Sequence, residues 1–435
     1  MQKIFVPLRS IDFGQEVWGP NDTLVLIGEV FHRGYVNGLV EAAQKRRMRI
    51  IQATVGRRDE NDQLRSLTQT ELANCPFECI NIPLEAGFSF EVVGDEKKSL
   101  LDRLNELKIL DWPSFTFSTD LLEQARQKAR ERFLENLTSF CEEIKKRVQT
   151  GHIIFAHLMA GGVPRSKTIL ALLNRTVKGR GNKFLSSQEL WESALGQVIN
   201  ANFYEVTAYS FELLLQASKP LREQLATNGR KIFYIAYGYH GTEVFIQNQL
   251  KWQSYAPYLQ GWAKLALEDF AVNARNQGIC ATVYNCPEIL TQSSAIFQGV
   301  EIPLYPLLQA FQIMLPEAKI TKNLLAQCEQ MLKAPFEDIL AICNQILTDP
   351  DVLACMDFEH WPNHNSSKQL TKILDASDQI ISMHQDPKQL VTFVLSEIVL
   401  KSCGEIMLNH VMNKKDPIVW LGHDIVVKTY HQLKS

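Results

Sequence analysis

TLVLIGEVFHRGYVNGLVEAAQKRRMRII, residues 23–51, gives the clearest indication of the fold class. It opens with a short apolar run, passes through a glycine-containing turn into an amphipathic segment, and ends at a second β-branched run. Strand, helix and strand in this order form the unit from which parallel sheets are built. The stretch therefore predicts an α/β fold.

The same alternation continues through the first two thirds of the chain. Six strands are expected, at 24–27, 49–55, 78–82, 152–157, 231–237 and 279–284. Between the third and fourth strands, apolar residues recur at helical spacing over 119–149, which predicts a long helix. This pattern predicts a doubly wound parallel Rossmann-type sheet.

From about Tyr305 onward the strand signals nearly vanish. Helices are expected at 305–314, 324–332 and 336–347, and one strand is expected to return to the sheet at 418–421 together with 425–427. No polar linker separates this tail from the front. We therefore expect a Rossmann-like core with insertions over 1–304, with a mainly helical C-terminal portion over 305–435 packed on it in the same globular unit.

The composition is that of an ordinary globular protein: of 435 residues, 46% are hydrophobic and 21% are charged. Lys and Arg number 45 and Asp and Glu 48, so a net charge of −3 gives no strong field that attracts nucleic acid. The longest apolar run, 153–160, is far shorter than the roughly 20 residues that span a bilayer. The start of the chain lacks a secretory signal pattern, and the nine scattered cysteines complete no metal site. We expect a cytoplasmic protein with no nucleic-acid partner and no membrane span.

Three glycines, Gly28, Gly34 and Gly38, lie around the first strand–helix turn. Glycine lets the backbone approach a phosphate, and the following helix offers it free N–H groups and the positive end of a dipole. The spacing G-x5-G-x3-G differs from G-x-G-x-x-G, so helix-packing glycines are the alternative. After the second strand, Arg57 and Arg58 stand where an arginine accommodates the extra phosphate of NADP. This favours NADPH over NADH, with a solvated basic loop as the alternative.

Tyr255 and Lys264 are separated by eight residues, in a stretch expected to open a helix. A tyrosine hydroxyl can hydrogen-bond a carbonyl oxygen that gains charge during reduction. A nearby ammonium lowers the pKa of the phenol and can hold the ribose of a nicotinamide cofactor. The pair fits reduction of a carbonyl group, with the chance occurrence of a Tyr and a Lys on one helix as the alternative.

This pair, together with TQSSAI at 291–296 and Pro303-Leu-Tyr, resembles the FabV-type trans-2-enoyl-ACP/CoA reductases of the short-chain dehydrogenase/reductase superfamily. The resemblance implies an oxidoreductase of fatty acid biosynthesis that reduces 2-enoyl thioesters with NADPH or NADH, the acyl group being carried by acyl carrier protein or coenzyme A. The residues it would use are Tyr255 as proton donor, Lys264 on the cofactor ribose, Tyr237 as a second tyrosine with Tyr239 as its alternate, and Thr291, Ser293 and Ser294 beside the nicotinamide and its phosphates.

Three other interpretations stay open. A ketoreductase of the same superfamily would use an upstream hydroxyl, and Thr242 lies thirteen residues before Tyr255. An inactive relative would bind cofactor or acyl carrier without turnover. The third interpretation is a nucleotide triphosphatase. Its triphosphate-binding loop would be Gly161–Thr168, which differs from the usual pattern by one residue, because Ser166 stands where the last glycine belongs. The basic segment 178–183 is either an exposed loop or a contact for an acidic carrier protein.

Overall fold

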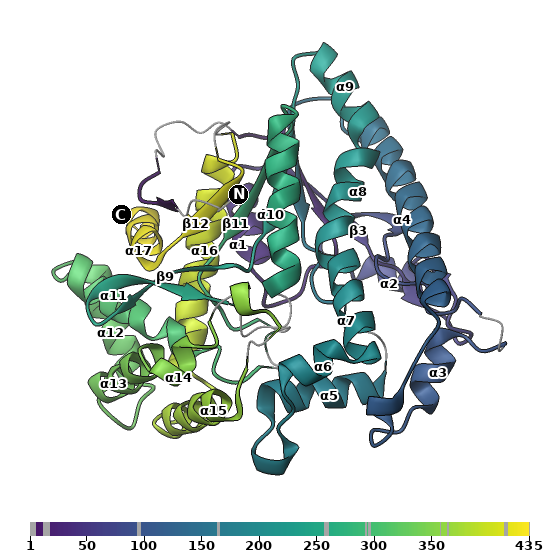
Figure 1. The fold of residues 1–435 in the computed structure, drawn as a ribbon. Helices are drawn as coiled ribbons and strands as arrows, with labels where there is room; N and C mark the ends of the chain where they lie inside the picture. Colours follow the sequence, from purple (N-terminus) through teal and green to yellow (C-terminus); the bar gives the residue numbers. More distant parts are fainter. Residues whose placement is uncertain are drawn as a thin grey trace.

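In the computed structural model, the described residues place eight strands in one parallel sheet, in the order β6-β3-β2-β7-β8-β11-β12-β1 (Figure 1). The structure describes residues 6–11, 18–93, 97–162, 166–255, 261–291, 294, 297–356, 358–362, 365–412 and 416–434. The strands are β1 (Pro7–Leu8), β2 (Thr23–Ile27), β3 (Arg49–Thr54), β6 (Glu78–Pro83), β7 (Ile153–His157), β8 (Ile232–Tyr237), β11 (Cys280–Asn285) and β12 (Ile418–Leu421). The six strands expected in the front of the chain are confirmed.

Alternating side chains bury both faces of this sheet. Leu24 and Leu26 of β2 belong to one apolar core with helices α1 (Val36–Lys45) and α16 (Val391–His410). Val25 and Ile27 belong to the opposite core. The helices on that side are α4 (Thr119–Arg147), α8 (Ser210–Ala217) and α10 (Gly261–Asn276). Helices on both faces make the sheet doubly wound, and α4 confirms the long helix expected at 119–149.

The last strand comes from the C-terminal portion and lies inside the sheet, between β11 and β1. It confirms the strand expected at 418–421. The expectation of further strand at 425–427 is wrong, because these residues lie in helix α17 (His423–Lys434). Ile425, Val426 and Val427 are fully buried there, so packing outweighs the strand preference of β-branched side chains.

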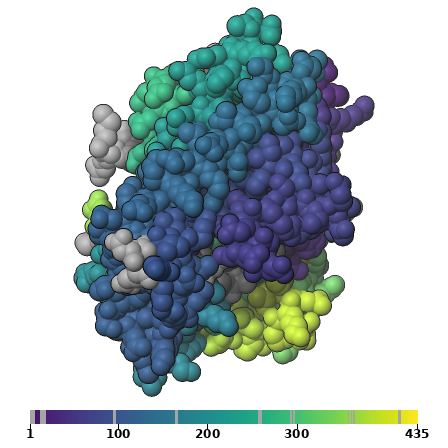
Figure 2. Space-filling view, turned by 90° about the vertical axis from the view of Figure 1, so that its right-hand side faces the viewer, coloured from purple at the N-terminus to yellow at the C-terminus, as the bar shows by residue number. Residues whose placement is uncertain are grey.

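Close packing of α16 on α1 joins the two ends of the chain. A Cβ atom added to Gly38 of α1 would lie 1.7 Å from the carbonyl oxygen of Leu400, and one added to Gly404 would lie 2.1 Å from the carbonyl carbon of Gly38. Only glycine permits this approach. Figure 2 shows the yellow-green C-terminal segments directly against the purple N-terminal ones.

A β-hairpin between β8 and Tyr255 was not expected from the sequence. Strands β9 (Gly241–Ile246) and β10 (Gln249–Ser254) pair antiparallel, and Gln247 and Asn248 form the turn with φ of 51° and 64°. Two residues with positive φ are the usual turn for strands of right-handed twist. Tyr255 follows β10 and is not helical, so the expectation that it opens a helix is wrong; residues 256–260 lie outside the described part.

The C-terminal helices gather beside this hairpin, at the lower left of Figure 1. They are α11 (Pro306–Met314), α12 (Lys319–Glu329), α13 (Phe336–Leu347), α14 (Pro350–Leu353) and α15 (Ser367–Ser382). Helical structure in this region is confirmed, with the second helix starting five residues earlier than expected. In the described residues, no helix combines the length and the apolarity needed to cross a membrane.

Candidate active site

A cleft opens where strands β2, β7, β8 and β11 end. Its empty volume is about 970 Å³, measured to its open mouth, and residues that follow these four strands line it together with Lys264 of α10. The chain leaves β2 toward β3 on one side and continues from β7 to β8 on the other. In open α/β sheets, ligands bind in the crevice at such a switch point.

Lys264 reaches the cleft from the first turn of α10. Its side chain is 6% exposed, and its ammonium donates a hydrogen bond of 2.6 Å to the carbonyl oxygen of Tyr237. Burial lowers the pKa of Lys264 to about 7. The amine therefore sits close to its titration point at neutral pH, and its remaining hydrogens can serve a ligand.

Tyr237 ends β8 and also lines the cleft. Its buried hydroxyl has no hydrogen-bond partner within the part of the chain that the structure describes. Burial raises the pKa of Tyr237 well above its ordinary value. The ring of Tyr35 lies 5.7 Å away, centroid to centroid, and the Tyr35 hydroxyl donates to the carbonyl oxygen of Pro287 at 2.6 Å. A buried, unsatisfied hydroxyl costs free energy that a ligand oxygen would recover.

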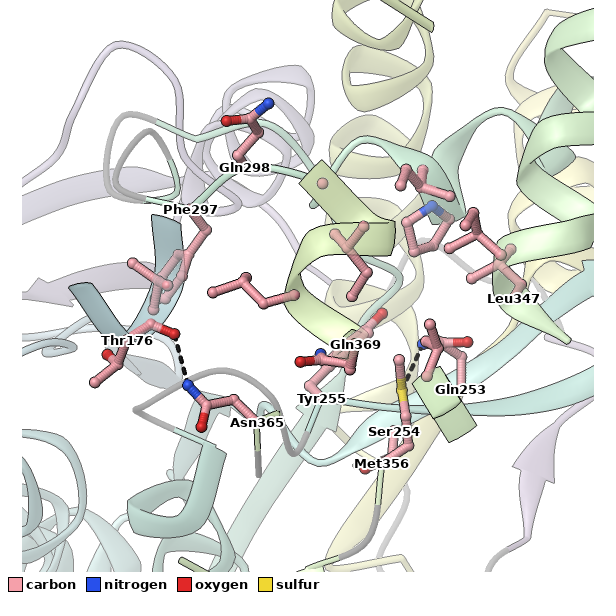
Figure 3. A pocket seen from close by; sticks show the side chains of 18 residues that line it. Thr176, Gln253, Ser254, Tyr255, Phe297, Gln298, Leu347, Met356, Asn365 and Gln369 are labelled. Carbon is pink, nitrogen blue, oxygen red and sulfur yellow. Dashed lines mark hydrogen bonds between the residues drawn. The ribbon is translucent and has the colours of Figure 1, made fainter. Parts of the chain in front are cut away.

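Tyr255 lies in the wall rather than on the surface of the cleft. It is 1% exposed, and its hydroxyl donates to the carbonyl oxygen of Cys286 at 3.3 Å. Burial raises the pKa of Tyr255 well above its ordinary value. Its ring lies 4.8 Å from that of Tyr239, which lines the cleft. Tyr255 also lines a second cavity, which is mostly apolar (Figure 3).

Glu288 is a buried acid of the cleft that sequence reasoning missed. It follows β11, is 2% exposed, and accepts a hydrogen bond from the Tyr239 hydroxyl, which lies 2.7 Å from both carboxyl oxygens. Burial raises the pKa of Glu288 to about 8. At neutral pH it is therefore mostly a neutral acid. Nothing in the local sequence signals this, because burial depends on the surrounding fold.

His157, at the end of β7, is a second missed residue. Its Nε2 atom lies 2.8 Å from the Ser210 hydroxyl, while its buried Nδ1 atom has no partner among the described residues. Burial, with the charge of Lys264 as a smaller cause, lowers the pKa of His157 well below its ordinary value. A neutral ring with one open nitrogen thus faces the cleft.

The three glycines of the first turn have different surroundings. Gly28 ends β2 with φ of 126°, and a Cβ atom there would lie 3.1 Å from the Cβ atom of Leu158. Gly34 lines the cleft just before α1. Gly38 lies in the α1–α16 contact, which is the helix-packing alternative. Arg33, another missed residue, lines the cleft mouth with its guanidinium 4.4 Å from the ring centre of Phe393.

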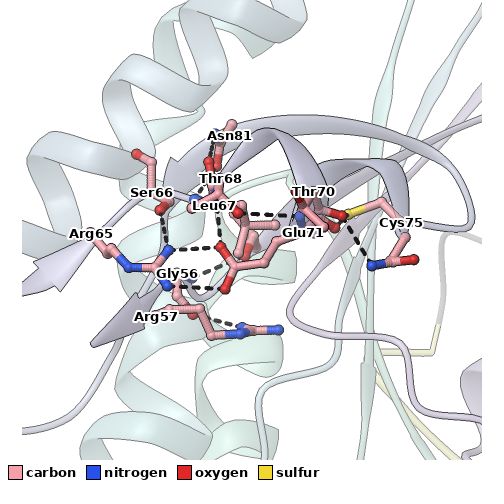
Figure 4. A network of polar contacts seen from close by, with 12 residues as sticks. Gly56, Arg57, Arg65, Ser66, Leu67, Thr68, Thr70, Glu71, Cys75 and Asn81 are labelled. Carbon is pink, nitrogen blue, oxygen red and sulfur yellow. Dashed lines mark hydrogen bonds and ion pairs between the residues drawn. The ribbon is translucent and has the colours of Figure 1, made fainter. Parts of the chain in front are cut away.

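Arg57 and Arg58 point to different places after β3. Arg57 lines a pocket at the end of β3 and forms an ion pair with Glu29 (Figure 4 shows Arg57 beside Gly56). The Arg58 guanidinium pairs with Glu85, with Nε 3.2 Å from Oε1. Arg57 therefore lies at the pocket where a ribose is expected, and its charge is already paired with that of Glu29.

Thr291 and Ser294 line the cleft and hold each other. The Thr291 amide donates to the Ser294 hydroxyl at 2.7 Å, and the Ser294 amide donates to the Thr291 hydroxyl at 3.0 Å. Ser293 lies outside the described residues. The site thus brings together Lys264, Tyr237 and this Thr–Ser pair, with Tyr255 behind the wall.

The residues that a ketoreductase or a triphosphate-binding loop would use form structural hydrogen bonds outside the cleft. Thr242 is fully buried in β9 and donates to the carbonyl oxygen of Leu421. Ser166 caps helix α5 (Lys167–Lys178), and the Thr168 hydroxyl donates to the carbonyl oxygen of Leu107 at 2.7 Å. None of these three hydroxyl groups lines the cleft.

Comparisons with known proteins point in one direction. The sequence profile of the family described as "Enoyl-acyl carrier protein reductase FabMG" matches residues 5–430. An apo structure of FabMG, a novel type of enoyl-acyl carrier protein reductase, is 38% identical, with a TM-score of 0.93 over 99% of this chain and 98% of that one. An NADH-bound structure of FabMG is 34% identical, with a TM-score of 0.77 over 98% and 99%. No curated protein sequence matches the chain.

Proposed function

The chain belongs to the FabMG family of enoyl-acyl carrier protein reductases, and from this premise we propose that a nicotinamide dinucleotide binds across the switch-point cleft. Family membership confirms the predicted enzyme class and its place in fatty acid biosynthesis. The narrower resemblance to FabV-type enzymes stays a proposal that rests on Tyr255-x8-Lys264. The observation that carries the cleft assignment is the meeting of Lys264 and Tyr237 at the switch point.

The residues of the cleft suit such a cofactor. Gly28 leaves the turn free of a side chain, and Arg33 lies with the start of α1 where the pyrophosphate is expected. Lys264 is placed to bond ribose hydroxyls. The open Nδ1 atom of His157 and the unpartnered hydroxyl of Tyr237 are polar groups that a bound ligand would satisfy. When bound, the reduced nicotinamide supplies the hydride that reduces the β-carbon of the substrate.

The side chains then manage the charge that reduction creates. As the β-carbon accepts the hydride, the electron pair of the C=C bond shifts onto the thioester oxygen. Tyr237 and Tyr255 donate hydrogen bonds to that oxygen, and Tyr255 gives up its bond to Cys286 to do so. Glu288, acting through the Tyr239 hydroxyl, supplies the proton that the α-carbon takes up, and it regains a proton from solvent.

We propose NADH as the cofactor, supported by the NADH-bound relative. The preference for NADPH, predicted from Arg57 and Arg58, stays a prediction. Two contacts weaken its premise, because Arg57 pairs with Glu29 and Arg58 pairs with Glu85. An arginine that is already neutralised gives a phosphate less attraction than a free one.

The substrate is proposed to arrive on acyl carrier protein, as the family description implies. The basic segment 178–183 offers an acidic carrier protein less positive charge than the sequence indicated, because Arg180 pairs with Asp375 and Asp378. A cytoplasmic location and a single globular unit also stay proposals. The unit is supported by β12, which inserts the portion 305–435 into the sheet of the portion 1–304.

Cofactor oxidation followed at 340 nm tests the function directly. Crotonyl and dodecenoyl thioesters of coenzyme A and of acyl carrier protein are offered with NADH and NADPH in separate assays. We expect NADH oxidation with enoyl thioesters and none with acetoacetyl thioesters. Turnover of acetoacetyl thioesters alone would establish the ketoreductase, and no oxidation together with no cofactor binding by calorimetry would refute the proposal.

A further inference from the structure

A second cavity, with about 680 Å³ of empty volume measured to its open mouth, begins at Tyr255 and extends among the C-terminal helices (Figure 3). Strand β10, the loop before α11, and helices α5, α13, α14 and α15 contribute to its walls. Its surface is mostly apolar, and the side chains that matter here are Phe297, Ile302, Ile346, Val352, Leu370 and Ile373. An apolar lining of this kind suits a hydrocarbon ligand.

Two polar side chains of the cavity are engaged with protein atoms, as the dashed lines in Figure 3 show. The Asn365 amide donates to the carbonyl oxygen of Thr176 at 2.8 Å, and the Gln253 amide donates to the sulfur of Met356 at 3.0 Å. A polar ligand would have to break these bonds. A hydrocarbon would lose nothing by entering.

The cavity and the cleft adjoin at two aromatic residues. Phe297 lines both of them. Tyr255 lines the cavity while its ring packs against Tyr239 of the cleft. A ligand that reacts in the cleft can therefore place its remaining length beside Tyr255 and Phe297 and then among the C-terminal helices.

Polar contacts hold helix α15 over the outer side of the cavity. Gln298 donates to Asp378 at 2.6 Å, and Arg180 forms ion pairs with Asp378, at 2.6 Å, and with Asp375. Gly299 fits closely beneath this helix, since a Cβ atom there would lie 2.3 Å from Cγ2 of Ile373. These contacts fix the position of Leu370 and Ile373 relative to the rest of the wall.

We propose that this cavity holds the hydrocarbon chain of the enoyl thioester, and that Leu370 and Ile373 of α15 determine which chain lengths fit. The inference rests on the proposed function of the cleft. A four-carbon chain ends near the reacting carbons and needs little of the cavity, whereas a twelve-carbon chain has to extend into it. Each additional buried methylene can strengthen binding by about fourfold, so the preference for long chains should be large.

The test compares kcat/KM for crotonyl and dodecenoyl thioesters of coenzyme A with NADH. In the wild type, we expect the twelve-carbon substrate to be preferred by at least about tenfold. Ile373→Phe narrows the cavity and should lower kcat/KM for dodecenoyl thioester at least about tenfold, while changing that for crotonyl thioester less than about twofold. Ile373→Ala widens it and should lower the dodecenoyl value severalfold through lost contacts, again sparing crotonyl.

Ile381→Phe is the matched control, because Ile381 lies on the same helix and does not line the cavity. It should leave the ratio of the two substrates unchanged. The cavity proposal is overturned if the wild type shows no chain-length preference, or if both Ile373 variants change the two substrates equally. The absence of wild-type turnover on crotonyl thioester would instead refute the proposed function, so the two failures are distinguishable. If Ile373→Phe does not fold, Ile373→Ala decides the outcome alone.

Discussion

The cleft and the apolar cavity share a wall at Tyr255 and Phe297, but different parts of the fold build them. Strand ends form the cleft and place ionisable groups in a buried setting, where the pKa of Lys264 falls to about 7 and that of Glu288 rises to about 8. Helices of the C-terminal portion, together with strand β10 and helix α5, form the cavity, and its surface is mostly apolar. The parallel sheet thus positions the chemistry, and the added helices provide room for the part of the substrate that does not react.

The largest effect is expected at the shared wall. Tyr255→Phe removes one donor to the charged oxygen and should lower kcat about 100-fold or more, with the Kd for NADH changed less than about twofold. Steady-state kinetics and calorimetry measure the two quantities. Tyr234→Phe is the control, since Tyr234 is buried in β8 but bonds Ser218 and Arg222 away from the cleft. Unchanged kcat in Tyr255→Phe would leave Tyr237 as the donor.

Lys264 offers a test of how strongly the cleft penalises charge. Its pKa is about 7 in the fold and 10.5 when unperturbed, so the folded state holds fewer protons than the unfolded state between these values. Its contribution to stability is complete above pH 10.5 and is lost as the pH falls toward 7. In the cofactor-free protein, we compare the free energy of unfolding of Lys264→Met with that of the wild type. The difference in favour of the variant should rise by about 3 kcal/mol when the pH is lowered from 9.5 to 7. Urea unfolding at both pH values measures the difference; a pH-independent difference contradicts it.

Glu288 should have a smaller effect that depends on pH. Glu288→Gln keeps a neutral, hydrogen-bonding side chain but cannot donate a proton, so kcat/KM at pH 7 should fall about tenfold. In the wild type, activity should decline as the pH rises through about 8, where Glu288 ionises. In Glu288→Gln, the ionisation of residue 288 should no longer contribute to the decline of activity with rising pH. Only the part of the decline that comes from Lys264 should remain. If the two pH profiles are parallel, Glu288 has no role in proton supply.

The smallest effect is expected at the separate pocket that follows β3. Arg57→Ala should weaken NADPH binding several-fold more than NADH binding, because the Arg57 guanidinium lies in the pocket after β3. Arg58→Ala is the matched control and should alter neither affinity, since Arg58 bonds Glu85 instead. Calorimetric titration with both cofactors measures this. Equal responses of the two variants would remove Arg57 from cofactor selection.

The strand pattern could be predicted because each buried strand is a short apolar run with clear ends, as at Thr23–Ile27. The hairpin 241–254 was missed because its turn uses Gln247 and Asn248 rather than a glycine pair, so the two strands did not separate in the pattern. The run 425–427 was wrongly expected as strand because its β-branched residues carry the same local signal whether a helix or a strand buries them.

Part of the candidate site was predictable from the family resemblance. It implied roles for Lys264 and Tyr237, and both line the cleft at the end of the parallel sheet. Glu288 and His157 could not be predicted, since their importance comes from burial and from partners distant in sequence. Gly38 and Gly34 looked equivalent in sequence, and only the approach of Leu400 separates a packing glycine from one beside the cleft.

The position of β12 between β11 and β1 has a consequence for how the protein is made. The pairing of Leu8 with Leu421 joins segments more than 400 residues apart, and β11 finds its neighbour only after the intervening helices have been synthesised. Closing so long a loop is slow, and until it happens the backbone edge of β11 can pair with other chains. Until the segment that carries β12 has been synthesised, the sheet is therefore incomplete, and the insertion of β12 covers the exposed edge of β11.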